Sequence, residues 1–210
     1  MTDSALREAI CEIARSLYDR GLTHGSTGNI SARCEDGWLL TPTGSSLGRL
    51  DPARLSKLDW NGALVAGDPP SKENFLHLAM YREQSRNHAV IHLHSTYSVA
   101  VSVLENVDRE DVLPPITAYY VMRIGQLPLV PYYAPGDQAL AEAVRQQASR
   151  HHALLLANHG PVVAASSLSA ASDAVEELEA TARLFLLLQG QAIRTLTPGQ
   201  CAQLKERYPT

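Results

Sequence analysis

Three histidines have the residue types and spacing of a metal site. His92 and His94 occupy alternate positions of the apolar segment 90–94, and His159 lies far downstream in the turn-like segment 158–161. Alternate residues of a strand point to the same face, so the first two imidazoles can share one site with a third from a turn. Three protein ligands and a free position are typical of catalytic metal sites. The pattern predicts a divalent-metal enzyme. The alternative is a solvent-exposed pair on an edge strand.

The remaining histidines are weaker candidates by pattern, and His151 and His152 are expected at a solvated helix end. Imidazole suits zinc, but it also suits other first-row divalent metals, so the histidines alone leave the ion open. The other members of this weaker set are His24, His77 and His88.

Glu73 is the carboxylate that we associate with this site, at the start of a helix expected over residues 73–85. A carboxylate in a first helical turn is favoured by the helix dipole, which is a sufficient structural reason for it. Next to a metal, the same carboxylate can be a fourth ligand, a general base, or each in turn. We therefore treat Glu73 as a candidate catalytic residue.

Three small-residue segments offer donors for a phosphate group. Ser71 and Lys72 precede Glu73, and the backbone N–H groups of a helix amino terminus attract anions. The loops 27–29 and 43–45 contain glycines, which permit close approach of the backbone. Each segment alone is an ordinary turn, but together they predict a phosphate pocket. Its other candidate residues are Thr27, Gly28, Asn29, Thr43, Gly44 and Ser45.

Composition limits the class of protein. The chain has 210 residues, of which 45% are hydrophobic and 19% charged, so we expect one domain over 1–210. A net charge of -4 gives no reason to expect nucleic acid or an anionic membrane as a partner. The amino terminus lacks a secretion signal pattern, and the apolar stretch 184–188 is too short to cross a bilayer. Three widely spaced cysteines form no disulfide framework. We expect a cytoplasmic protein.

Hydrophobic periodicity predicts alternating helices and short strands. Residues 25–31 are expected to form a loop that enters a strand, and Asn61-Gly62 is a hairpin signal. Together the elements predict an α/β sandwich with a mostly antiparallel sheet and helices on both faces. Strands are expected at 38–40, 57–60, 63–65, 89–95, 127–130, 153–157 and 162–165, and helices at 6–17, 73–85, 96–104, 137–150, 168–185 and after 197.

Taken in order, these motifs resemble the class II aldolase/adducin family, and the resemblance covers nearly the whole chain. It implies a three-layer class II aldolase-like sandwich and a zinc enzyme. It also implies a homotetramer with sites near the subunit boundaries. The segments that carry the resemblance are 25–31, 41–44, 70–73, 92–95 and 158–160.

The resemblance also implies a role for each candidate residue. His92, His94 and His159 become the metal ligands, and Glu73 becomes the acid/base residue, which can also touch the metal. The implied substrate is a small phosphorylated keto acid or sugar. The residues implied for its phosphate are Gly28, Asn29, Thr43, Gly44, Ser71 and Lys72.

Within the family, segments 70–73, 116–122 and 131–137 look like the branch that decarboxylates 3-oxo-tetronate 4-phosphates. That reaction gives dihydroxyacetone phosphate and carbon dioxide through a metal-stabilised enediolate. Lys72 stands where the sugar-phosphate aldolases usually carry a second serine, which disfavours a simple aldolase. Lys72 adds a positive charge beside the anion pocket, and a solvated lysine is the alternative explanation. An aldolase, a ribulose-phosphate 4-epimerase and a non-catalytic adducin-like module are the competing functions.

Tyr119 is implied as a second acid or an oxygen-stabilising donor, by analogy with a family tyrosine near this region. Tyr120 is the rival for this role, because the position is uncertain by a residue. A buried strand tyrosine that only packs is the structural alternative. In a tetramer, Tyr119 would serve the metal of a neighbouring subunit.

Overall fold

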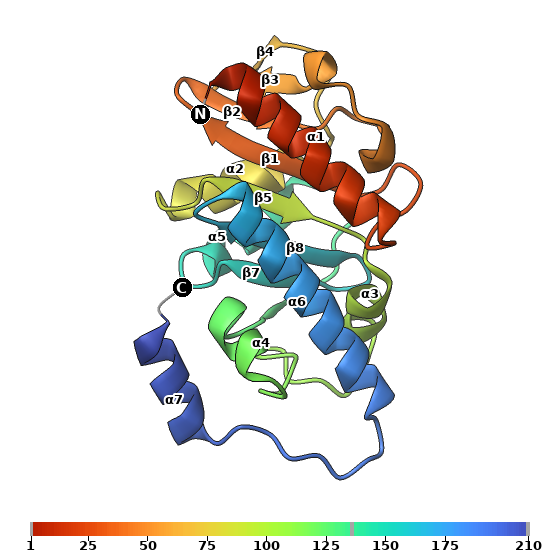
Figure 1. Ribbon diagram of the computed structural model, residues 1–210, viewed down its shortest axis with the longest axis vertical. Coiled ribbons are helices and arrows are strands. Elements are labelled where there is room, and N and C mark those ends of the chain that lie inside the picture. Colours follow the sequence, from red (N-terminus) through yellow and green to blue (C-terminus); the bar gives the residue numbers. More distant parts are fainter. Residues whose placement is uncertain (1, 135–136, 209–210) are drawn as a thin grey trace.

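An eight-stranded sheet forms the middle of the protein in the computed structural model, which describes residues 2–134 and 137–208 (Figure 1). The strands lie in the order β4-β3-β2-β1-β5-β8-β7-β6, and every pairing among them is antiparallel except that of β6 with β7. Their bounds are β1 Asn29–Cys34, β2 Gly37–Leu40, β3 Ser56–Leu58, β4 Leu64–Ala66, β5 Ala89–His92, β6 Leu129–Val130, β7 Ala153–Leu156 and β8 Gly160–Ala165.

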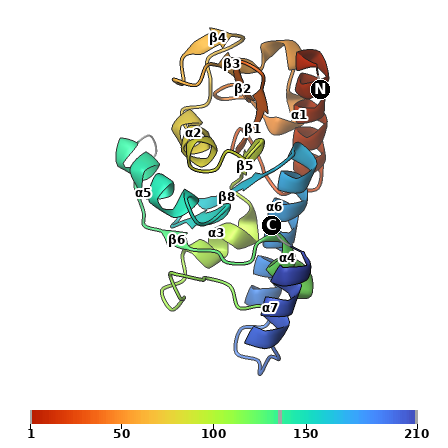
Figure 2. The same ribbon diagram turned by 90° about the vertical axis from the view of Figure 1, so that its left-hand side faces the viewer.

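Helices cover both faces of the sheet, so the described part of the chain has three layers (Figure 2). α1 and α6 lie on one face, and α2 and α5 pack together on the other. This arrangement confirms the predicted α/β sandwich. The helices are α1 Asp3–Asp19, α2 Asn74–Glu83, α3 Thr96–Ser102, α4 Ala118–Arg123, α5 Gln138–Ala148, α6 Leu168–Leu187 and α7 Pro198–Arg207, with short 3-10 turns at Leu47–Arg49 and Pro52–Arg54.

Two hydrophobic cores form because successive strand residues point to opposite faces. On β5, Ile91 packs into the core under α1 and α6, whereas Val90 packs into the core under α2 and α5. His92 has the same parity as Val90, so its imidazole lies on the α2 side of the sheet. This parity determines which helix can supply a partner for the histidine.

The histidine strand is shorter than expected. β5 ends at His92, where the sequence predicted a strand to residue 95. The backbone N–H of Leu93 still donates to the carbonyl of Pro161, at 3.3 Å, which ties the continuing segment to β8. His94 therefore lies just beyond the strand rather than within it.

Helix α4 occupies the segment in which we considered a strand tyrosine. The Thr117 side chain accepts a hydrogen bond from the backbone N–H of Tyr120, at 3.1 Å, which caps the helix at its amino terminus. Tyr119 is 60% exposed on this helix, and Tyr120 is 1% exposed. The packing alternative for this position was a tyrosine in a strand, whereas the structure has a helix, which the Thr117 cap and the packing of Tyr120 stabilise.

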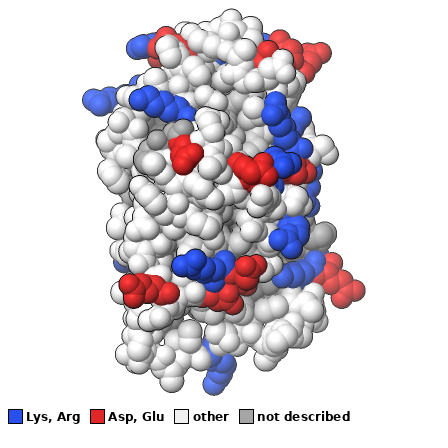
Figure 3. Space-filling view, turned by 180° about the vertical axis from the view of Figure 1, so that it is seen from behind, with Lys and Arg blue, Asp and Glu red and all other residues white. Residues whose placement is uncertain are grey.

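The surface carries no single-sign charge field on the face seen from behind Figure 1. Lysine and arginine side chains alternate there with acidic ones, and wide uncharged areas separate them (Figure 3). An anionic ligand on this face would need donors placed locally. None of the helices that the structure describes combines the length and apolar character that a bilayer span requires.

Candidate metal-binding active site

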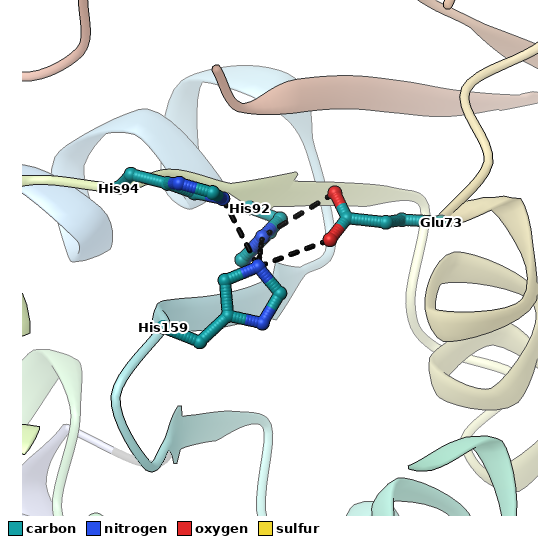
Figure 4. A group of neighbouring side chains, drawn as sticks. All are labelled: Glu73, His92, His94 and His159. Atoms are coloured by element: carbon teal, nitrogen blue, oxygen red, sulfur yellow. Dashed lines mark hydrogen bonds and ion pairs between the residues drawn. The ribbon is translucent and has the colours of Figure 1, made fainter. Parts of the chain in front are cut away.

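Three imidazoles and one carboxylate converge at the end of β5 (Figure 4). His92 comes from the strand, His94 from the segment after it, His159 from the turn between β7 and β8, and Glu73 from the N-cap position of α2. The Nε2 atom of His159 lies 3.3 Å from Nε2 of His92 and 3.1 Å from Nε2 of His94. The Glu73 carboxylate is 3.0 Å from His159 through Oε1 and 3.5 Å from His92 through Oε2.

This donor set fits a divalent metal. One ligand atom from each of the four residues lies within 4.8 Å of the others. Ligands at zinc-like bond lengths in a tetrahedral shell are about 3.3 Å apart, which matches the nitrogen separations. The Nδ1 atom of His92 lies 2.8 Å from the carbonyl oxygen of Pro161 and must donate to it. Its Nε2 lone pair therefore faces the cluster, as a ligand orientation requires.

Two glycine turns, one before β1 and one before β8, lie against the backbone of the histidine segment. A Cβ on Gly160, whose φ is +152°, would lie 2.2 Å from the carbonyl oxygen of Leu93. A Cβ on Gly28, at φ +78°, would lie 3.0 Å from the carbonyl oxygen of His92. Asn158 has φ 57°, a left-handed conformation that asparagine tolerates. These turns bring His159 and the 27–29 loop against the histidine segment.

Electrostatics prepare the cluster for a cation. Burial alone would raise the pKa of Glu73, but His92, His159 and Asn29 together bring this pKa well below the ordinary value of a glutamate. Burial lowers the pKa of His94 to about 3, and the neighbouring histidines add to the effect. For His92, burial lowers the pKa but the Glu73 carboxylate raises it above its usual value. A negative carboxylate and a neutral His94 are the states that bind a metal ion.

A cleft of about 630 Å³ opens beside the cluster. Glu73, His94 and His159 contribute to its wall. Its aromatic side chains belong to Tyr132 and Tyr133, which the sequence suggested only as part of the segment 131–137 and not as site residues. Pro135 and Gly136 of that segment lie outside the described residues. The rest of the wall consists of His24, Thr96, Val99 and Asn158.

The three small-residue segments meet in space. The backbone N–H of Ser71 donates to the carbonyl of Thr41, at 3.3 Å, and that of Thr43 donates to the carbonyl of Pro69, at 3.0 Å. The side-chain amide of Asn29 reaches the hydroxyl of Ser71, at 3.2 Å. The predicted grouping of the loops is therefore present, although their role toward a phosphate stays a prediction.

The predicted phosphate-pocket residues differ in exposure. Asn29 and Ser71 are buried, whereas Thr43, Gly44 and Lys72 are exposed. Gly44 has φ +68° with open space where a Cβ would lie, so its backbone is accessible. Among residues 2–134 and 137–208, Lys72 forms no ion pair. Its role toward an anion stays a prediction.

Tyr119 and Tyr120 are not among the described residues that line the cleft of their own chain. Tyr120 packs in the core under α1 and α6, and burial together with the Asp111 carboxylate raises the pKa of its phenol. Tyr119 points outward from α4 and is mostly exposed. Within one chain, neither tyrosine reaches the cluster, and the catalytic role of Tyr119 stays a prediction.

Comparisons with known proteins define the class. The family model for the class II aldolase and adducin N-terminal domain matches residues 8–186. The chain belongs to the class II aldolase/adducin family. The predicted extent of the domain, 1–210, stays a prediction.

Particular relatives are similar along nearly their whole length. A 3-oxo-tetronate 4-phosphate decarboxylase from Haemophilus influenzae is 50% identical over 208 residues, which cover 99% of each chain. The solved structure of YgbL from Escherichia coli is 48% identical, with a TM-score of 0.95, over 98% of this chain and 100% of that one. An L-fuculose 1-phosphate aldolase structure is 26% identical, with a TM-score of 0.88, over 100% of this chain and 99% of that one.

Proposed function

We propose that this protein is a metal-dependent carboxy-lyase that converts 3-oxo-tetronate 4-phosphate to dihydroxyacetone phosphate and carbon dioxide. The observation that carries the proposal is the convergence of Glu73, His92, His94 and His159 at one cleft. The 50% identity with a decarboxylase over 99% of both chains supports this substrate. We propose zinc as the ion, because three imidazoles and a carboxylate suit it.

The bond that breaks joins the carboxylate carbon to the hydroxyl-bearing carbon of a β-keto acid. A divalent metal in this site would act as a Lewis acid for the negative charge that develops on the substrate oxygens. The electron pair of the broken bond is kept as an enediolate, and a proton must then reach carbon. We propose that Glu73 delivers it: the carboxylate would take a proton from solvent in the cleft through Oε1 and pass it to the carbon, while Asn29 holds Oε2, at 2.7 Å.

The phosphate group of the substrate would bind where the three loops meet. The Ser71 hydroxyl oxygen lies 3.2 Å from the Asn29 amide and 3.3 Å from the backbone N–H of Glu73, and it accepts from both. Its own proton is then free to donate to a phosphate oxygen. Gly28, Thr43 and Gly44 would add small or backbone donors. Lys72 would add a charge at the rim.

We propose a homotetramer with each site near a subunit boundary, in which Tyr119 acts on the site of a neighbour. The exposure of Tyr119, and its separation from the cleft of its own chain, support this arrangement. We also propose a cytoplasmic location. The cysteines Cys11, Cys34 and Cys201 are all free, which fits a reducing compartment.

The test is incubation of the purified protein with the keto-acid phosphate, with and without a chelator, while dihydroxyacetone phosphate and carbon dioxide are followed. We expect equal amounts of both products, loss of both with chelator, and recovery on adding zinc. Metal-dependent aldehyde release from a ketose 1-phosphate, without carbon dioxide from the keto acid, would instead identify an aldolase. We choose the aldolase assay for comparison because the chain is 36% identical to an L-fuculose phosphate aldolase from Methanocaldococcus jannaschii.

A further inference from the structure

A buried chain of hydrogen bonds runs from the core to the Glu73 carboxylate. Glu73, His77 and Tyr81 are four residues apart along α2 and its cap, so they lie on one helical face. Asn29 and Ser31 are alternate residues of β1 and share one strand face. The side chains of these two β1 residues form hydrogen bonds with the side chains of the three residues of α2 and its cap.

The contacts between these rows are short and continuous. The Tyr81 hydroxyl lies 2.7 Å from Oγ of Ser31, which lies 2.7 Å from Nδ1 of His77. Nε2 of His77 lies 2.5 Å from Oδ1 of Asn29, and Nδ2 of Asn29 lies 2.7 Å from Oε2 of Glu73. His77 and Ser31 are 0% exposed and Tyr81 is 2% exposed.

Chemistry allows one direction for this chain of bonds. A carboxylate only accepts, so the Asn29 nitrogen must donate to Glu73, and the Asn29 oxygen is left to accept from His77. Nε2 of His77 therefore carries the proton. Burial lowers the pKa of His77 to about 3, so the ring is neutral and its Nδ1 is an acceptor. Ser31 must donate to Nδ1, and Tyr81 must donate to Ser31.

We propose that His77, Ser31 and Tyr81 are positioning residues that hold the Asn29 amide in one orientation, so that it fixes Oε2 of Glu73 and leaves Oε1 to transfer the proton. A rotated amide would turn its oxygen toward the carboxylate and break the bond to His77. None of these three residues touches substrate in this proposal. They act through Asn29. The catalytic role of these residues rests on the proposed function, whereas the donor and acceptor assignment of the hydrogen bonds does not.

The first test determines the donors and acceptors of these hydrogen bonds and needs no activity assay. Nitrogen-15 NMR of the imidazoles, on the full chain with and without zinc, reports which ring nitrogen of His77 carries the proton. We expect a neutral ring with the proton on Nε2 in both samples. A proton on Nδ1 would overturn the proposal, whatever reaction the protein catalyses.

The second test measures how the loss of each positioning residue changes kcat. In His77→Phe, which keeps a ring but no polar atoms, we expect kcat to fall about 10- to 100-fold, the usual effect of removing an outer partner of an active-site group. The KM and the zinc content should not change. His77→Gln, which restores a donor toward Asn29, should recover most of kcat. Tyr81→Phe, two bonds further away, should cost about 2- to 10-fold.

His152→Phe is the matched control. His152 is also a histidine with a pKa lowered by burial, although it is only partly buried, and its Nδ1 donates to the carbonyl of Ala164, at the end of β8 remote from His159. It should keep wild-type kcat. Equal losses in His77→Phe and His152→Phe, or no loss in His77→Phe, would overturn the proposal.

A further readout is the fate of the proton itself. In deuterated water, the wild type should place deuterium on one face of the product carbon, and His77→Phe should mix the two faces. Retained single-face labelling in a slowed His77→Phe would argue against positioning. If the wild type produces no dihydroxyacetone phosphate at all, the proposed function fails, and the NMR result still decides the chain of bonds.

Discussion

The two sides of the cleft are built differently. On the metal side, His92 is fully buried, and Glu73 accepts hydrogen bonds inside its own chain. On the open side, Tyr132 is 62% exposed and Tyr133 is partly buried. The metal side is complete within one chain before any ligand arrives. The open side leaves these rings exposed, where a substrate or, in the proposed tetramer, a second copy of the chain would meet them.

The largest effect is expected when a proposed metal ligand is removed. His92→Ala removes the most buried ligand of the cluster, so zinc content and decarboxylation should be lost together, down to the detection limit. Metal analysis beside a product assay checks this, with thermal unfolding as the measure of folding. Full zinc occupancy in the variant would count against the ligand assignment.

Glu73→Gln separates metal binding from proton transfer on the same side. The amide keeps the size of the side chain but cannot exchange a proton, so turnover should fall about 10²- to 10⁴-fold, as for a lost general acid or base. Zinc content should stay near that of the wild type. Turnover close to normal would show that another group protonates the carbon.

Tyr119→Phe tests whether the open side is completed by a neighbouring subunit. Loss of the hydroxyl should lower kcat about 10- to 100-fold if the phenol stabilises developing charge. Mixing this variant with Glu73→Gln and reassembling the oligomer should restore part of the activity, because some sites then receive both native residues. If no activity returns in mixed oligomers, the two residues serve the same chain.

The smallest effect is expected at the rim. Lys72→Ser should raise the KM for the phosphorylated substrate about 2- to 10-fold, the size of one exposed hydrogen bond, and leave kcat near its wild-type value. The dependence of KM on salt should weaken as well, because a charge has been removed. An unchanged KM and an unchanged salt response would mean that Lys72 is a solvated lysine.

The sequence predicted the fold class, and it marked as candidate ligands the four residues that the structure brings together. Apolar periodicity marked the sheet and its covering helices, and the imidazole pair marked the cluster. The end of β5 was predicted three residues too late, since the apolar run continues through Leu93 while the pairing stops at His92. The packing alternative for Tyr119 assumed a strand, and a capped helix is present instead.

His77 is the residue that pattern reading undervalued. It was set aside with the weaker histidines, yet it lies between Ser31 and Asn29 in the chain that ends at Glu73. A signal was present, since Glu73, His77 and Tyr81 repeat at a helical spacing of four. It could not be used alone, because nothing in the sequence says that this helix face meets Asn29 and Ser31.

By itself, the sequence determined which donors the protein has, namely imidazoles on an apolar segment and a carboxylate at a helix start. Only the tertiary structure decided which of them meet. The antiparallel register pairs Asn29 with His92 and His92 with Val162, and the Gly160 turn then brings His159 beside them. Residue type sets what an atom can donate or accept, whereas the distance between remote atoms depends on strand register and close packing.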